Sequence, residues 1–216
     1  MDSPTIIDTA PGTCGDLVLR RAGHHYEIIA DGMFLMDTRA GESERLLVRA
    51  AAARMPGHRL LIGGLGVGIS LHEALSLDVR SITVVEREPA VVNWNHQHFG
   101  NTAALSDPRV RCLQTDLVSW LATTPERFDA LCLDIDNGPD WTLSSSNASL
   151  YSAEGLDVLA SRLTPGGILT IWSAADSQPF TAALRDRFTH VEVLPVPVPR
   201  GEPDVVFLAS TAAAIC

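Results

Sequence analysis

The stretch Arg59-Leu60-Leu61-Ile62-Gly63-Gly64-Leu65-Gly66-Val67-Gly68-Ile69-Ser70 decides the fold of this chain. A short apolar run ends in a glycine cluster, and a segment with helical spacing follows it. A strand, a tight turn and a helix in that order bring a nucleotide against bare backbone at a helix N-terminus. We therefore predict a cofactor-binding loop made by Gly63, Gly64, Gly66 and Gly68.

From Arg59 onward, apolar runs alternate with helical segments. The expected strands are 59–62, 81–86, 109–113, 128–134, 166–172, 189–194 and 204–209, and the expected helices are 69–77, 89–98, 116–122, 151–162 and 177–187. This alternation predicts an α/β fold with a doubly wound, mostly parallel sheet of seven strands. The Pro-rich connection 195–203 is too short for a helical crossover, so the last strand should be antiparallel. That arrangement is typical of the class I methyltransferase-like Rossmann fold.

The first 54 residues follow a different pattern. Short strand-like runs lie at 17–19, 26–29 and 33–36, and Asp31-Gly32 between the last two indicates a tight hairpin. A helical pattern follows over 42–54 and ends at Pro56-Gly57. We therefore divide the chain into an N-terminal β-hairpin element with a linking helix, residues 1–54, and a class I methyltransferase-like domain, residues 55–216.

Composition narrows the function classes. A net charge of −10 over 216 residues disfavours a general nucleic-acid binder and an anionic membrane surface. The sequence has no run of 18 apolar residues, so we expect no membrane span. Its first residues lack the profile of a signal peptide. Cys112 and Cys132 lie in apolar runs, as buried reduced thiols do. We expect a cytoplasmic protein without a metal, because no third ligand accompanies His96 and His98.

Two acidic residues follow the second and third expected strands. Glu86 ends the second strand, 18 residues beyond Gly68, where a carboxylate can accept hydrogen bonds from ribose hydroxyls. Asp116 could accept the exocyclic amine of an adenine, and it could equally cap the helix that follows. A dinucleotide loop needs a third glycine where Ile69 or Leu71 stands, so the spacing disfavours NAD.

The fourth expected strand delivers Asp134, Asp136 and Asn137 just beyond its carboxyl end, where open α/β sheets bind ligands. Two carboxylates on one side of an extended chain could hold a cationic substrate or take a proton from an amine. A turn that merely ends the strand is the alternative interpretation. Trp141 comes directly after this acidic loop, and we expect it to form a wall of the substrate pocket.

At this point the chain resembles the spermidine synthase-like family, which comprises aminopropyltransferases built on the class I methyltransferase fold. The segments that carry the resemblance are Gly63-Gly64-x-Gly66-x-Gly68, Val85-Glu86, Thr115-Asp116, Asp129 to Asp134, and Leu150-Tyr151 through 163–169. The resemblance implies that Glu86 binds the ribose and Asp116 the adenine amine. It also implies that Asp134 deprotonates the attacking amine. Asp136, Asn137 and Tyr151 would then hold the substrate, and a homodimer is expected because the relatives form dimers or tetramers.

The chain departs from the family pattern in two places. The family usually carries an Asp near the position of Gly66, and its Tyr-His-Glu stretch appears here as Glu42-Ser43-Glu44. Because Gly66 is uncharged, the first hypothesis is transfer of a methyl (or other alkyl) group from S-adenosylmethionine to a small amine-bearing molecule. The alternative is spermidine synthase-type aminopropyl transfer from decarboxylated S-adenosylmethionine to a diamine. The third hypothesis is a non-catalytic nucleoside-binding protein.

Overall fold

The computed structural model describes residues 3–13, 15–39, 41–142, 145–199 and 201–213. Its larger sheet has seven strands in the order β10-β11-β9-β8-β5-β6-β7. The strands are β5 (Arg59–Gly63), β6 (Ser81–Glu86), β7 (Val110–Gln114), β8 (Phe128–Leu133), β9 (Leu163–Ser173), β10 (His190–Val196) and β11 (Asp204–Ser210). Strand β11 pairs antiparallel with both β9 and β10, whereas the other neighbours pair parallel. The predicted doubly wound sheet with an antiparallel last strand is confirmed.

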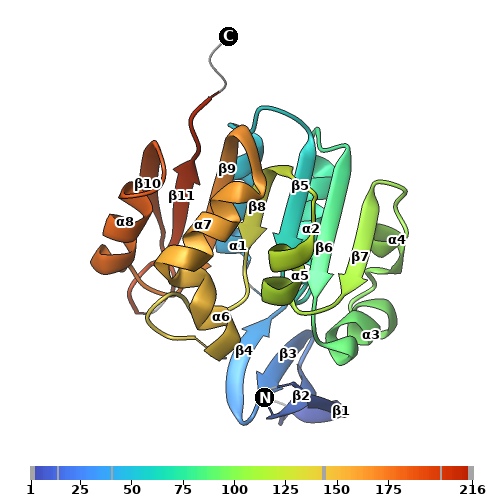
Figure 1. Cartoon of the computed structure of the whole chain (residues 1–216). Coiled ribbons are helices and arrows are strands. Elements are labelled where there is room, and N and C mark those ends of the chain that lie inside the picture. The colour runs from blue at the N-terminus through green and yellow to red at the C-terminus, as the bar shows by residue number, and fades with distance from the viewer. Residues whose placement is uncertain (1–2, 14, 40, 143–144, 200, 214–216) are drawn as a thin grey trace.

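Helices cover both faces of this sheet (Figure 1). On one face lie α1 (Glu42–Ala52), α2 (Ile69–Ser76), α3 (Pro89–Gln97) and α4 (Thr102–Leu105), and on the other lie α5 (Leu117–Thr123), α7 (Ala153–Ser161) and α8 (Gln178–Arg185). Alternation along β5 explains the two layers, because Leu60 and Ile62 pack with the first group and Leu61 with the second. A short helix α6 (Ser145–Ala148) and a 3₁₀ turn η1 (Ser149–Tyr151) lead from β8 toward α7.

The N-terminal residues form a separate antiparallel sheet in the order β1-β2-β3-β4. Its strands are β1 (Thr5–Gly12), β2 (Gly15–Ala22), β3 (His25–Ala30) and β4 (Met33–Asp37). The predicted hairpin at Asp31-Gly32 is present, with positive φ angles of 47° and 78°. Strand β1 was not predicted, because none of its residues is buried and its sequence carries no apolar alternation.

The N-terminal sheet contacts the main domain at the carboxyl ends of the parallel strands (Figure 1). The indole nitrogen of Trp94 in α3 donates to the Asp8 carboxylate at 2.7 Å. The backbone N–H of Thr13 donates to the Glu88 carboxylate, and Tyr26 packs edge-on against Phe99 at 5.5 Å. The N-terminal sheet therefore covers the edge of the main sheet where a ligand would bind.

Helix α1 follows the N-terminal sheet in sequence but packs on the main sheet, where Thr170 donates to the carbonyl of Leu47 at 3.1 Å. The division of the chain after residue 54 stays a prediction. In the described part of the chain, no helix is long and apolar enough to cross a membrane. Within the same residues, no group of three or more His, Cys, Asp and Glu side chains could hold a metal ion.

Candidate active site

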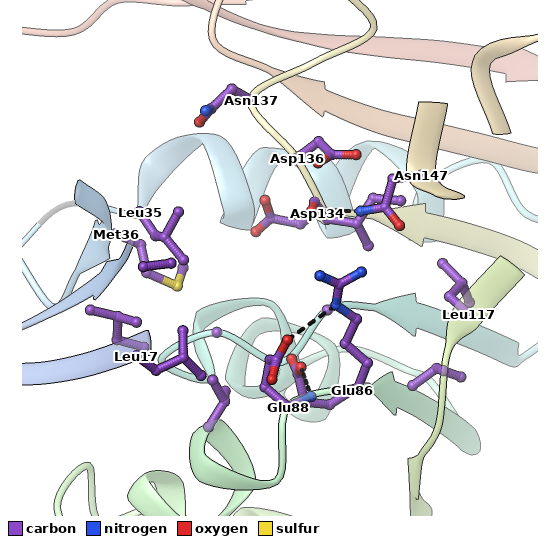
Figure 2. Close-up of a pocket in the computed structure, with 18 of the residues that line it drawn as sticks. Leu17, Leu35, Met36, Glu86, Glu88, Leu117, Asp134, Asp136, Asn137 and Asn147 are labelled. Carbon is purple, nitrogen blue, oxygen red and sulfur yellow. Dashed lines mark hydrogen bonds and ion pairs between the residues drawn. The ribbon is translucent and has the colours of Figure 1, made fainter. Parts of the chain in front are cut away.

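A cavity of about 310 Å³ lies between the N-terminal sheet and the carboxyl ends of β5, β6, β7 and β8. Small-molecule sites commonly measure roughly 300–1,000 Å³. One wall comes from the N-terminal sheet and is mostly apolar, with Asp31 of the hairpin as its charged residue; the apolar side chains are those of Leu17, Ile28, Ala30, Met33, Leu35 and Met36. Polar groups from the parallel strands form the opposite side, as Figure 2 shows.

Two of the four predicted glycines reach this cavity. Gly64 and Gly66 line it and have positive φ angles of 88° and 51°. A side chain at Gly64 would collide with the carbonyl oxygen of Asp134, and a Cβ at Gly66 would lie 2.5 Å from the Met36 sulfur. Gly63 ends β5 and Gly68 precedes α2, so these two shape the turn without lining the cavity.

Glu86 ends β6 and lines the cavity, although only 7% of it is exposed. One carboxylate oxygen accepts the backbone N–H of Leu65 at 2.8 Å, and the other accepts that of Glu88 at 2.8 Å. Burial raises the pKa of Glu86, and the backbone hydrogen bonds oppose that rise. The side chain therefore clamps the glycine loop to the end of β6.

Asp116 is the predicted helix cap, and its role toward an adenine stays a prediction. It precedes α5, and its Oδ1 accepts the backbone N–H of Ser119 at 2.8 Å, as an N-cap does. The same side chain lines the cavity. Capping uses one carboxylate oxygen, so the other can accept a hydrogen bond from a ligand.

The predicted acidic loop after β8 also reaches the cavity. Asp134, Asp136 and Asn137 all line it, and Figure 2 shows both aspartates above the glycine loop. Burial raises the pKa of Asp134 to about 8, and the negative charge of Glu44 adds to the rise. The ionised form of this carboxyl group is thus a stronger base than the carboxylate of an ordinary aspartate.

Two predicted substrate-binding residues lie outside the cavity lining. Trp141 does not form the expected wall: 60% of it is exposed, because a turn in which its N–H donates to Gly138 carries it away from the cavity. Tyr151 packs edge-on against Phe180 at 5.5 Å. Burial raises its pKa, and the nearby charge of Asp136 contributes, so Tyr151 stands behind the acidic loop.

Sequence reasoning missed several lining residues. Glu44 comes from the first turn of α1, and Arg87 contacts the Glu88 carboxylate at 3.2 Å just after β6. Asn147 donates to the carbonyl of Ile135 at 3.3 Å, and Figure 2 shows it beside Asp134. Glu44 had a signal, because it stands at the glutamate of the family's Tyr-His-Glu stretch, whereas Asn147 lies in a serine-rich segment without one.

A family model describing the spermine/spermidine synthase domain matches residues 44–192. The chain belongs to the spermine/spermidine synthase family. Among its relatives, polyamine aminopropyltransferase 1 of Streptomyces coelicolor is 34% identical over 125 residues, 56% of this chain and 23% of the relative. Polyamine aminopropyltransferase 2 of Pseudomonas aeruginosa is 32% identical over 170 residues, 71% of this chain and 46% of the relative. The chain thus matches less than half the length of each of these two family members.

Solved structures confirm the fold of this family member. A spermidine synthase in complex with the transition state analogue AdoDATO superposes with a TM-score of 0.79. That comparison covers 97% of this chain and 74% of the other at 17% identity. The spermidine synthase of Thermotoga maritima gives a TM-score of 0.75 at 18% identity, with the same coverage.

These comparisons correct the first functional hypothesis. Methyl transfer from S-adenosylmethionine was preferred because Gly66 is uncharged, and that preference was wrong. The matched domain is that of spermine and spermidine synthases, and the relatives are named polyamine aminopropyltransferases. One missing carboxylate in the glycine loop is therefore a poor guide to the group transferred, while the broader assignment to a transferase family stands.

Proposed function

We propose that this chain is an aminopropyltransferase that moves the aminopropyl group of decarboxylated S-adenosylmethionine to an amine. One observation carries the proposal: Glu86, Asp116 and Asp134 follow three strands of the sheet and line a single cavity with Gly66. Family membership supports the reaction class. Because the matched relatives are much longer than this chain, the activity of the complete relatives reaches it only as this proposal.

In this proposal the nucleoside lies along the ends of β5, β6 and β7. The Glu86 carboxylate already accepts the backbone N–H groups of Leu65 and Glu88, and in this proposal a lone pair that the backbone does not use accepts a ribose hydroxyl. Asp116 accepts the exocyclic amine of the adenine with the oxygen that α5 does not use. Gly64 and Gly66 let the ribose approach the backbone closely.

The chemical step is a displacement at the carbon next to the sulfonium. The amine nitrogen forms a bond to that carbon while the carbon–sulfur bond breaks. The electron pair of that bond stays on sulfur, which leaves as the neutral thioether 5′-methylthioadenosine. The proton that the nitrogen loses passes to Asp134, whose raised pKa of about 8 suits it to accept a proton near neutral pH.

The acceptor side of the cavity matches a cationic amine. Glu44, Asp134 and Asp136 line it, and Asn137 adds a neutral polar group. Arg87 is the cation among the described lining residues, and Glu88 contacts it. The excess of negative charge favours an ammonium group, and alignment of its nitrogen with the donor carbon accounts for much of the catalysis.

The experiment is to incubate the purified chain with decarboxylated S-adenosylmethionine and a panel of amines, and to quantify methylthioadenosine by mass spectrometry. Asp134→Asn should abolish turnover yet keep the affinity for methylthioadenosine. Asp140→Asn is the matched control, because Asp140 is exposed on the same loop and does not line the cavity. Binding without turnover on any amine would favour a non-catalytic nucleoside-binding protein. Failure to bind methylthioadenosine at all would refute the proposal.

A cytoplasmic location and a homodimer are part of the proposal as well. Both rest on the sequence and on the family resemblance. Light scattering after size-exclusion chromatography tests the dimer directly, and a monomer at micromolar concentration would contradict it.

A further inference from the structure

Two buried asparagine side chains hold the glycine loop, and a histidine contacts one of them. Asn95 is fully buried in α3, and Asn101, which precedes α4, is 4% exposed. The side-chain nitrogen of Asn95 donates to the carbonyl of Gly66 at 2.8 Å. That of Asn101 donates to the carbonyl of Val67 at 2.9 Å. His72 of α2 contacts Asn101 Oδ1 at 2.7 Å. The side chain of His72 is exposed, so this series of hydrogen bonds ends at the surface.

The orientation of both amides is determined by their partners. Asn95 Nδ2 also donates to the carbonyl of Val91 at 2.8 Å, and Asn101 Nδ2 also donates to Asn95 Oδ1 at 2.7 Å. Carbonyl oxygens only accept, so both amide nitrogens must face the loop. Since Asn101 Oδ1 is an acceptor as well, His72 must donate to it from Nε2. The network therefore has one arrangement, and every member contributes to it.

This arrangement sets the direction of the loop's backbone donors. A trans peptide is planar, so holding the carbonyl of Gly66 toward α3 turns the N–H of Val67 the opposite way. Gly68 donates to the carbonyl of Leu65 at 2.9 Å, which closes the turn. Within the described ranges, the N–H groups of Gly66 and Val67 donate to no protein atom. Two adjacent donors are thus available on a loop whose residue Gly66 lines the cavity.

We infer that Asn95 and Asn101 are positioning residues for the donor nucleoside, an inference that rests on the proposed function. They act through the loop: Asn95 holds the carbonyl of Gly66, which fixes the N–H of Val67, and Asn101 holds the carbonyl of Val67, which fixes the N–H of Gly68. Because that N–H holds the carbonyl of Leu65, the N–H of Gly66 in the same peptide is fixed as well. The N–H groups of Gly66 and Val67 thereby stay aimed at the oxygen atoms of the bound nucleoside. The fit is close, because a Cβ at Gly68 would collide with Asn101 Nδ2. Donors fixed before binding lose less entropy when the ligand arrives.

The test measures binding of methylthioadenosine by isothermal titration calorimetry, with melting temperatures recorded for every variant. Asn101→Asp keeps the shape of the side chain and the oxygen that His72 contacts, but it removes the donor to the carbonyl of Val67 and to Asn95 Oδ1. One hydrogen bond of this kind corresponds to about a tenfold rise in Kd. His96→Ala is the matched control, because His96 is exposed nearby and contacts Thr102 rather than the asparagines.

A merely structural role would lower the number of binding sites and leave the Kd of the remaining folded protein unchanged. A raised Kd at full stoichiometry, with His96→Ala like the wild type, supports the inference. An unchanged Kd in folded Asn101→Asp overturns it. If that variant does not fold, His72→Ala decides: its exposed side chain can be removed safely, and about a twofold to threefold rise in Kd is expected. Wild-type protein that binds no methylthioadenosine refutes the proposed function instead.

Discussion

Replacing Asp134 with asparagine should stabilise the ligand-free protein, and the gain should grow as the pH rises. Burial and the charge of Glu44 raise the pKa of Asp134 from 3.8 to about 8. Below pH 3.8 the carboxyl group is protonated in both the folded and the unfolded chain. Between these two values only the unfolded chain ionises, so the wild type loses stability as the pH increases. Above pH 8 both states are ionised and the penalty is constant. Asparagine does not titrate, so the difference between the proteins follows this loss.

The size of the effect follows from the shift. About four pKa units at about 1.4 kcal/mol each set an upper limit of about 6 kcal/mol. The gain and the pKa are linked: each pKa unit that separates the folded from the unfolded carboxyl group adds about 1.4 kcal/mol to the gain. For a protein of 216 residues, each kcal/mol of gain corresponds to a rise in melting temperature of about 2–4 °C.

The assay is a thermal melt followed by circular dichroism at pH 5, 6.5, 8 and 9, at constant ionic strength and without ligand. Asp140→Asn on the same loop controls for the loss of one negative charge. The gap between Asp134→Asn and the wild type should widen up to pH 8 and then level off. A gap that is equal at pH 5 and pH 9 would refute the raised pKa, and with it the physical basis for Asp134 as proton acceptor.

Three further substitutions separate roles that coincide at one residue. Glu86→Ala removes the clamp on Leu65 and the proposed ribose acceptor, so Kd for methylthioadenosine should rise about 10- to 100-fold in calorimetry. Asp116→Asn keeps a good helix cap, whereas Asp116→Ala loses about 1 kcal/mol of stability. We expect weaker nucleoside binding in both variants and a lower melting temperature only in the alanine variant. That result shows two independent roles of Asp116. Gly66→Ala places a Cβ at a φ of 51° against Met36 and should lower the melting temperature by about 2–6 °C in a fluorescence melt, and Met36→Ala in the same chain should recover only the steric part.

The main domain could be predicted from sequence because each of its helices and strands has a typical local sequence pattern. The run Leu60 to Ile62 is buried on both faces, as parallel strands are, and Gly68 precedes α2 where the pattern changes from strand to helix. The Pro-rich connection 195–203 correctly predicted the antiparallel last strand. Strand β1 lacks such a signal, since it is held by pairing with β2 and by the contact from Asp8 to Trp94 rather than by burial of its own side chains.

The candidate site also contains residues that the sequence could locate and residues that it could not. Residues that follow parallel strands could be located, because topology brings the ends of those strands to one edge; Glu86, Asp116 and Asp134 meet in the cavity for that reason. The position of Trp141 could not be predicted, because a turn at Gly138 directs it outward. The apolar wall from the N-terminal sheet depends on how two separate sheets dock, which no local pattern in either segment reveals.

The error over the transferred group has a physical explanation in the same cavity. The methyl-transfer hypothesis treats Gly66 as the loss of a negative charge that is needed to hold an ammonium group. The charge that a ligand meets is the sum over the whole cavity, and Glu44 and Asp136 both contribute to that sum. The space beside Gly66 is filled by the Met36 thioether, so the uncharged glycine goes together with an apolar neighbour from β4. The cavity therefore stays acidic although the glycine loop carries no acidic residue. The spermine/spermidine synthase assignment is compatible with an uncharged loop.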